Sequence, residues 1–182
     1  MQILSAFIEN PKEYIYFSDR EPGEKLMFLL RRHPITNLGW IFTTLVLLAL
    51  PTALNYIVNA SDLALPVEFG LVTNFVFYLF AAIFAFESFL TWFYNVFIIT
   101  DRRIVDINFY GFFYKRVTEA PWQNIEDTTY TQSGVLQTIF NFGDVFVQTA
   151  AEQREFGFES VPQPRKVYDI ITDLVAANQK NE

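Results

Sequence analysis

The side chains that carry most enzyme chemistry are scarce in this chain. It has no cysteine and a single histidine, His33, which stands beside Arg31 and Arg32. Thiolate nucleophiles, disulfides and cysteine-ligated metals are therefore excluded, and one imidazole is too little for a histidine-based metal site. The 7 glycines are scattered, so they form no glycine-rich phosphate loop. We expect no enzymatic activity, no cofactor and no metal site.

The acidic residues are not arranged for acid–base catalysis. Glu126 and Asp127 are neighbours on an expected strand, where they point to opposite faces. Glu87 lies in an apolar run, and a carboxylate in hydrocarbon is a candidate for ion or proton coupling. It stands only about five residues before Trp92, roughly 7–8 Å of helix rise, and can therefore reach the interface. We expect interfacial or helix–helix contact at Glu87 rather than transport.

Two pairs of cations could bind an anion. These candidate ligand-binding residues are Arg102 with Arg103, and Lys115 with Arg116. From Asp101 onward, however, acidic residues outnumber basic ones, which disfavours a general attraction to anionic surfaces.

The middle of the chain predicts two membrane crossings. The chain has 182 residues, of which 52% are hydrophobic, and no lysine or arginine lies between His33 and Asp101. Two helices are expected, at 35–58 and 69–92, each long enough to cross a hydrocarbon core of about 30 Å. Trp40 and Trp92 are expected to serve as interfacial anchors at these helices.

The flanking charges predict the orientation. Arg31 and Arg32 precede the first helix, Arg102 and Arg103 follow the second, and the linker between the helices has no cation. Because basic residues favour the cytoplasmic side, we expect a multi-pass protein of the cytoplasmic (inner) membrane with both termini in the cytoplasm.

After the second helix the apolar period changes to that of strands. Six short strands are expected over 95–100, 104–109, 112–118, 125–132, 144–149 and 156–161. An amphipathic helix over 165–178 follows them. The sequence thus predicts an N-terminal cytoplasmic segment (1–34), a membrane helical hairpin (35–93) and a cytoplasmic domain (94–182). That domain is expected to be a mostly-β sandwich or partly open barrel capped by the C-terminal helix.

One turn of this meander is a candidate for contact with the membrane. The second strand must return toward the bilayer, which brings down the aromatic residues Phe109, Tyr110, Phe112, Phe113 and Tyr114, with Lys115 and Arg116 behind them. The fourth strand returns too and places Val135, Leu136, Ile139, Phe140 and Phe142 near the same level. The alternative is that these side chains form ordinary sandwich core or protein contacts.

Short motifs in the strands carry a family resemblance. They are ITDRRI at 99–104, PWQNIED at 121–127, QSGVL at 132–136 and NFGDV at 141–145. In this order after two apolar helices, they resemble the bacterial pleckstrin-homology (PH)-like domain of small two-helix membrane proteins, long classed as a domain of unknown function. The resemblance covers nearly the whole chain, from about Glu24 to Val175. It implies a PH-like fold for the strands and the helix that follows them, and it imports no specific activity.

We therefore expect a non-enzymatic interaction or scaffold module, anchored in the lipid bilayer. Its exposed aromatic residues favour a protein partner or a second copy of the chain, and nothing points to nucleic acid. The alternative is a domain that binds a lipid headgroup or a small anionic ligand.

Overall fold

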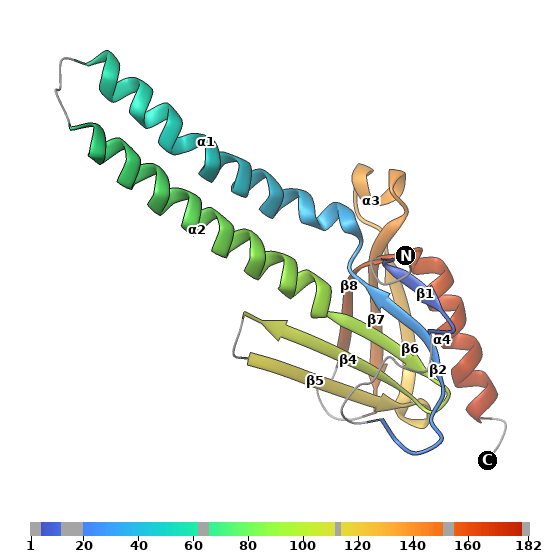
Figure 1. The fold of residues 1–182 in the computed structure, drawn as a ribbon. Coiled ribbons are helices and arrows are strands. Elements are labelled where there is room, and N and C mark those ends of the chain that lie inside the picture. Colours follow the sequence, from blue (N-terminus) through green and yellow to red (C-terminus); the bar gives the residue numbers. More distant parts are fainter. Residues whose placement is uncertain (1–4, 12–19, 62–65, 112–113, 151–154, 180–182) are drawn as a thin grey trace. The chain divides into compact units, whose positions relative to one another are not determined.

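The strands and helices follow the expected order, with two further strands near the N-terminus. The computed structural model describes every residue except 1–4, 12–19, 62–65, 112–113, 151–154 and 180–182. The strands are β1 (Phe7–Glu9), β2 (Leu26–Arg31), β3 (Val96–Thr100), β4 (Arg103–Tyr110), β5 (Tyr114–Pro121), β6 (Ile125–Thr131), β7 (Phe142–Thr149) and β8 (Glu155–Pro162) (Figure 1). The α-helices are α1 (Leu38–Ala60), α2 (Val67–Tyr94), α3 (Val135–Ile139) and α4 (Pro164–Gln179), with 3-10 turns η1 (Pro34–Asn37) and η2 (Trp122–Asn124).

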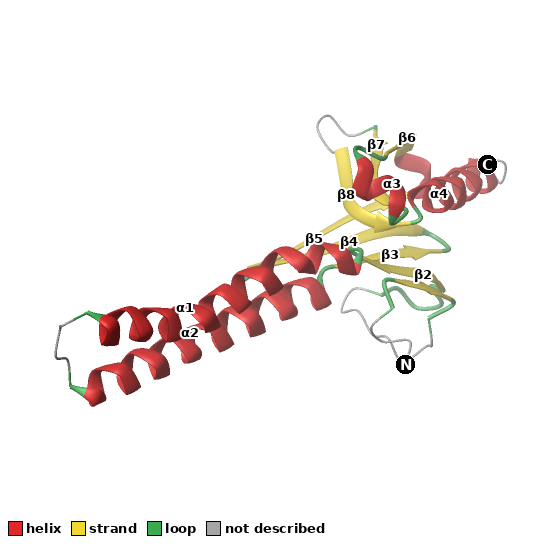
Figure 2. Ribbon diagram, turned by 90° about the horizontal axis from the view of Figure 1, so that it is seen from above, coloured by secondary structure: helices red, strands yellow, loops and turns green. Residues whose placement is uncertain are grey.

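The strands form two antiparallel sheets. One has the order β1-β2-β3-β4-β5 and the other the order β6-β7-β8 (Figure 2). In the described part of the chain no ladder joins the two sheets, so they form an open sandwich rather than a closed barrel. Between them lies one core of buried side chains, which includes Leu30, Ile99, Ile104, Val145 and Val147. The predicted mostly-β sandwich is confirmed.

Helix α4 completes this core. Its residues Val167 and Ile171 are fully buried in the same cluster as the strand side chains, and Trp122 of η2 packs there too. The spacing of four residues places Val167 and Ile171 on one face of the helix. The C-terminal helix therefore caps the sandwich, as its amphipathic pattern predicts.

The N-terminal segment contributes strands to the sandwich, although the sequence analysis sets it apart. Strand β2 pairs with β3, with Leu30 opposite Phe97 and Arg31 opposite Val96. Met1–Pro34 and Phe93–Glu182 consequently form one compact unit, and Ile35–Trp92 forms the other. Leu30 is fully buried, so β2 supplies core side chains that β3 to β8 would lack. The helices are thus inserted between two neighbouring strands of one sandwich.

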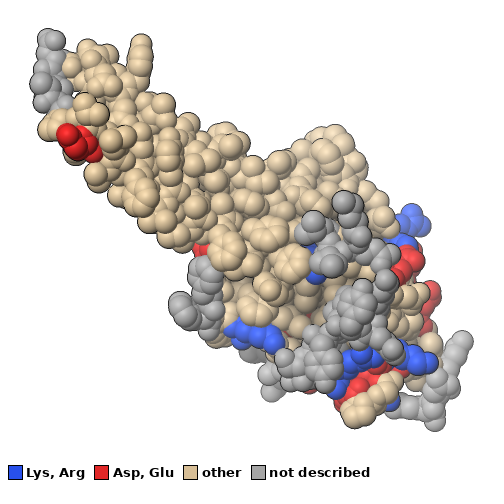
Figure 3. Space-filling model, in the orientation of Figure 1, with Lys and Arg blue, Asp and Glu red and all other residues tan. Residues whose placement is uncertain are grey.

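The second unit is the helical hairpin. Both of its helices are long and apolar enough to cross a membrane. On the face drawn in Figure 3 they present almost only uncharged side chains, whereas lysine and arginine gather over the strands. Between the helices, Asn55 donates a hydrogen bond to Asn74 at 2.8 Å, and Ala81 is fully buried. The two asparagines therefore pair with each other between the helices.

Candidate functional site: a polar cleft at the exit end of the sandwich

One end of the sandwich is defined by the two points where the chain leaves it for the helices. Arg31 is the last residue of β2 and lies opposite Val96 near the start of β3. We call this end the exit end, and the opposite end, which holds the Asp101–Arg103 turn, the turn end. Because adjacent antiparallel strands are about 5 Å apart, the two connections lie side by side.

The buried guanidinium of Arg31 fastens the two connections together. Its Nε donates a hydrogen bond to the Phe93 carbonyl at 3.0 Å, and its charge lies 4.7 Å from the centre of the Phe93 ring. A further bond of 3.4 Å reaches the carbonyl of Ser5. Arg31 thus serves the structure of the exit end, and it is not a free cation for a ligand.

His33 extends this arrangement to the second sheet. Its backbone N–H donates to the Ser160 carbonyl at 2.7 Å, and its ring stacks on Phe142 at 5.1 Å. Burial lowers the pKa of His33 below its usual value, which favours the neutral imidazole. The contact places the start of β7, and with it α3, at the exit end.

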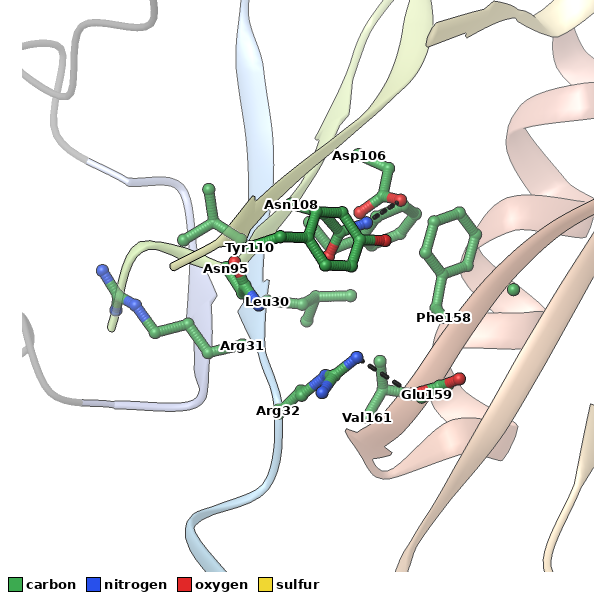
Figure 4. Close-up of a pocket in the computed structure, with 13 residues that line it drawn as sticks. Leu30, Arg31, Arg32, Asn95, Asp106, Asn108, Tyr110, Phe158, Glu159 and Val161 are labelled. Atoms are coloured by element: carbon green, nitrogen blue, oxygen red, sulfur yellow. Dashed lines mark hydrogen bonds and ion pairs between the residues drawn. The ribbon is translucent and has the colours of Figure 1, made fainter. Parts of the chain in front are cut away.

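Between the two sheets at the exit end lies a cleft, the exit cleft, with a volume of about 100 Å³. Its lining comes from β2, β3, β4 and β8 and from the residues that adjoin them, and includes Arg32, Asn95, Asp106, Asn108, Tyr110, Phe158 and Glu159 (Figure 4). Along the inner face of β4 the side chains change from the buried Ile104 to Asp106, Asn108 and Tyr110. The apolar core therefore gives way to a polar cavity where the sheets part.

Asp106 is the most perturbed acid among the described residues that line the cleft. Burial raises its pKa to about 6, against weaker lowering by the hydrogen bond from Asn108 and by the charges of Arg32 and Arg116. The Asn108 amide donates this bond at 2.6 Å, and no cation lies within ion-pair distance of Asp106 among the described residues. Desolvation without a cationic partner is thus the reason for the high pKa.

Across the cleft Arg32 and Glu159 form an ion pair. Arg32 Nη2 lies 2.9 Å from Glu159 Oε2, and both side chains remain partly open to solvent. Figure 4 shows this pair on one side of the cavity and the Asp106–Asn108 pair on the other. Two arginines line the cleft, and because Arg31 is bonded to the Phe93 carbonyl, the small space is bounded by Arg32 and by the acids Asp106 and Glu159.

The aromatic hairpin predicted to contact the membrane, Phe109–Tyr114, also lies at the exit end. Val96 pairs with Ile107, so the last residues of β4 project beyond the start of β3. Tyr110 and Tyr114 are each more than half exposed, and their rings lie 5.7 Å apart. Phe109 is half-buried, with the Lys115 ammonium 5.9 Å from its ring. Phe112 and Phe113 lie outside the described residues.

A second apolar surface at the exit end is formed by α3. The side chains of Val135, Leu136, Ile139 and Phe140 are 73%, 62%, 68% and 47% exposed. No charged residue occurs between Asp127 and Asp144. Phe142, which the sequence analysis groups with these four, is instead buried beneath His33.

The predicted ligand residues Arg102 and Arg103 lie at the turn end, away from the exit cleft. Arg103 forms two bonds, of 3.0 and 3.1 Å, to the fully buried carboxylate of Glu24 and pairs with Glu119 as well. Arg102 pairs with Glu21 at 2.9 Å. Both arginines thus hold the Glu21–Glu24 loop against the β3–β4 turn. Lys115 and Arg116 lie exposed on β5, near the aromatic hairpin.

Three predicted residues belong to the helical hairpin. Trp40 is half-buried and donates from its ring nitrogen to the Asn37 side chain at 3.0 Å, whereas Trp92 is buried and contacts Phe89. Glu87 is half-buried in α2, about two turns before its end. Among the described residues no cluster of acids and histidine forms a metal site.

Sequence reasoning missed Asp106 and Asn108 because they alternate with Val105, Ile107 and Phe109 along β4. That pattern is usually read as a polar face in water and an apolar face in the core. Here both faces are covered, since Ile98, Val105 and Ile107 form a second buried cluster on the outer face. The signal available in the sequence was that Asp106 and Asn108 continue, at a spacing of two residues, the row of side chains that Ile104 begins on the inner face.

Comparisons with known proteins give one family. The family model of the bacterial PH domain matches residues 35–175 of this chain. A crystal structure of a DUF1696 family protein with a pleckstrin-homology domain, from Shewanella loihica PV-4, is similar with 14% sequence identity and a TM-score of 0.34, covering 45% of this chain and 68% of that one. No curated protein matches the chain.

Proposed function

The chain belongs to the bacterial PH domain family, and we propose that within it the chain acts as a non-enzymatic, membrane-anchored interaction module. Its two apolar helices cross the cytoplasmic membrane, both termini lie in the cytoplasm, and the sandwich presents a surface to a protein partner or to a second copy. The domain limits that fit this role are a sandwich built from 1–34 and 93–182 and an anchor built from 35–92.

The observation that carries this proposal is the insertion of the helical hairpin between two paired strands. Because Arg31 and Val96 are opposite each other, both ends of the hairpin must lie on the same side of a membrane that the helices cross. The sandwich is thus tethered to its anchor by two connections at one end, unlike a domain on a single linker. Such a constraint suits a module that offers its remaining surface to a partner.

Two apolar surfaces support contact of the exit end with the bilayer. The aromatic hairpin combines Tyr110 and Tyr114 with Lys115. Helix α3 and the following Phe140 add four exposed apolar side chains without a charge. Aromatic and apolar groups with a nearby cation are favoured in the headgroup region of a membrane. We expect both surfaces to lie in that region.

Site-specific labelling tests this arrangement, and the absence of cysteine makes it direct. A single cysteine at Leu136, labelled with an environment-sensitive fluorophore in reconstituted vesicles, should give blue-shifted emission that brominated lipids quench. The matched position is Glu126, an exposed residue of β6, where neither effect is expected. Equal emission and quenching at the two positions would contradict the membrane contact.

The interaction itself is tested in native membranes. Copies with two different tags are expressed together, and a photo-crosslinker is placed at Glu126, at Lys166 of α4 or at Tyr110. If the sandwich presents a surface to a partner, the crosslinker at Glu126 or Lys166 should give one discrete protein adduct. This adduct should carry both tags if the partner is another copy of the chain. The crosslinker at Tyr110 should give lipid adducts. Absence of any protein adduct from the exposed positions would reject the interaction role.

A second candidate function is binding of a lipid headgroup or a small ligand. The exit cleft favours it, because it is a cavity with unequal charges on its two sides. Arg102 and Arg103 are weaker candidates for binding such a ligand, because they already form ion pairs with Glu21 and Glu24.

A further inference from the structure

The exit cleft is lined by polar and charged side chains where the inner face of the sheet would otherwise continue the apolar core. A core position on β4 would be filled by an apolar residue, as Ile104 is, yet the next two inward positions hold Asp106 and Asn108. Burying a carboxylate without a cation costs free energy, and the cleft leaves about 100 Å³ of space in front of it. A ligand that brings a positive group would remove this cost.

Arg32 and Glu159 restrict what that ligand can be. A simple anion that bound Arg32 would displace Glu159 and leave it unpaired near Asp106, where its charge already raises the pKa of that carboxyl. A simple cation that bound Asp106 and Glu159 would take Glu159 from Arg32 and add a second positive charge beside that guanidinium. A small zwitterion satisfies both, because each of its charges replaces one partner of the existing ion pair.

We propose that the exit cleft binds a zwitterion in which a primary ammonium stands two carbons from a phosphodiester, the headgroup chemistry of ethanolamine phospholipids. The ammonium lies between Asp106 and Glu159, and the phosphodiester oxygens accept hydrogen bonds from Arg32. This assignment rests on the proposed function, because a membrane anchor would keep the exit end close to phospholipid headgroups.

The rest of the lining agrees with this ligand. Tyr110 and Phe158 line the cleft and offer aromatic surface to an ammonium group. A primary ammonium also donates three hydrogen bonds, for which the Asp106 and Glu159 carboxylates are acceptors. A trimethylated ammonium donates none and is larger, so a choline headgroup should bind less well. The volume admits a headgroup but no acyl chain, which would remain outside.

Binding is measured on the full chain, purified in mild detergent and freed of lipid. The soluble probes are glycerophosphoethanolamine, glycerophosphocholine and glycerophosphoglycerol, titrated by calorimetry. In a second arm, native mass spectrometry counts retained phosphatidylethanolamine and phosphatidylglycerol. Binding of the soluble ethanolamine probe shows that a free small zwitterion suffices, whereas binding of the phospholipid alone shows that the glycerolipid is the source.

The variants are Asp106→Asn and Arg32→Gln, with Glu126→Gln as the control that removes an exposed acid from β6. Asp106→Asn keeps the shape of the side chain, so the fold is retained. We expect each cleft variant to weaken binding of the ethanolamine ligand at least about tenfold, the loss of one charged hydrogen bond, and the control to leave it unchanged. The unmodified chain should prefer ethanolamine over glycerol and choline headgroups.

Three results would overturn the proposal: no binding of either ethanolamine ligand, equal binding of the glycerol headgroup, or unchanged binding by Asp106→Asn. Because binding is measured in detergent, it does not depend on the anchor. Failure of the anchoring is seen separately, as release of the chain from membranes at alkaline pH.

Discussion

At the scale of single residues, Asp106 makes stability depend on pH in an unusual direction. Its pKa of about 6 lies above the ordinary 3.8, so the folded chain binds more protons than the unfolded chain between about pH 4 and 6. Stability contributed by this group is therefore present below pH 4 and is lost as the pH rises toward 6. The loss amounts to about 2–3 kcal/mol.

Replacing Asp106 with Asn should abolish this dependence. In lipid-free detergent at pH 7.5, Asp106→Asn is expected to unfold at a higher temperature than the unmodified chain, and the difference should shrink toward pH 4. The charges that face the group are Arg32, Arg116 and Glu159, and all three are retained. Thermal unfolding followed by circular dichroism measures the difference. A constant gap across this pH range would contradict the assignment.

Glu24 predicts the opposite pH dependence. Burial alone would raise its pKa, but hydrogen bonds from Arg103, the Glu21 backbone and Thr100 outweigh burial and lower it. Its contribution is therefore present above the unfolded value of about 4.5 and is lost as the pH falls further. Glu24→Ala should lower the free energy of unfolding by about 3 kcal/mol, because Arg103 is left buried without its main partner. The control is Glu126→Ala, which removes an exposed acid. If both variants lowered the free energy of unfolding by a similar small amount, Glu24 would not have this stabilising role.

At the scale of elements, Gly143 allows β7 to pass close to β6. A Cβ at this position would lie 2.4 Å from the Thr131 carbonyl oxygen, a backbone atom that cannot move aside. Gly143→Ala is expected to destabilise the sandwich by about 2 kcal/mol or more through displacement of the strand pair. Gly157→Ala serves as the control, because its Cβ meets only the Phe146 ring at 3.3 Å. Equal unfolding temperatures for the two variants would contradict this interpretation.

At the scale of the whole molecule, the sandwich should survive without its membrane helices. Residues 34–93 can be replaced by Asn-Gly. In the register set by Arg31 and Val96, the shortened chain would then place Arg32 opposite Asn95 and His33 opposite Tyr94 in a new hairpin. A two-residue Asn-Gly loop is the preferred connection of such a hairpin. We expect a monomeric or discretely oligomeric domain with cooperative unfolding, measured by size-exclusion chromatography and circular dichroism.

The matched fragment 94–182 should fail to fold cooperatively. It lacks β2, so the edge of β3 and the core around Ile99 would be exposed. A cooperative transition in this fragment, equal to that of the Asn-Gly chain, would show that β2 is dispensable.

The alternation of apolar residues after Tyr94 predicts all six strands from β3 to β8, and the spacing of Val167 and Ile171 predicts α4. These features are local, since side-chain periodicity follows directly from backbone geometry. The segment Leu26–Arg31 was not recognised as a strand, because its last residue, Arg31, and the following Arg32 were interpreted as the basic flank of an apolar helix. Its partner β3 is distant in the chain, and no local pattern identifies a pairing across two helices.

The two apolar helices, the succession of strands, the capping helix and the family resemblance could all be inferred from the residues alone, because each depends on residue types at short spacing. Three features required the folded chain: the completion of the sandwich by β2, the pairing of Arg102 and Arg103 with acidic residues, and the position of Asp106 across a cleft from Arg32 and Glu159. The physical reason is that burial and charge pairing depend on which distant segments meet, and a carboxylate acquires an unusual pKa only when other strands remove it from water.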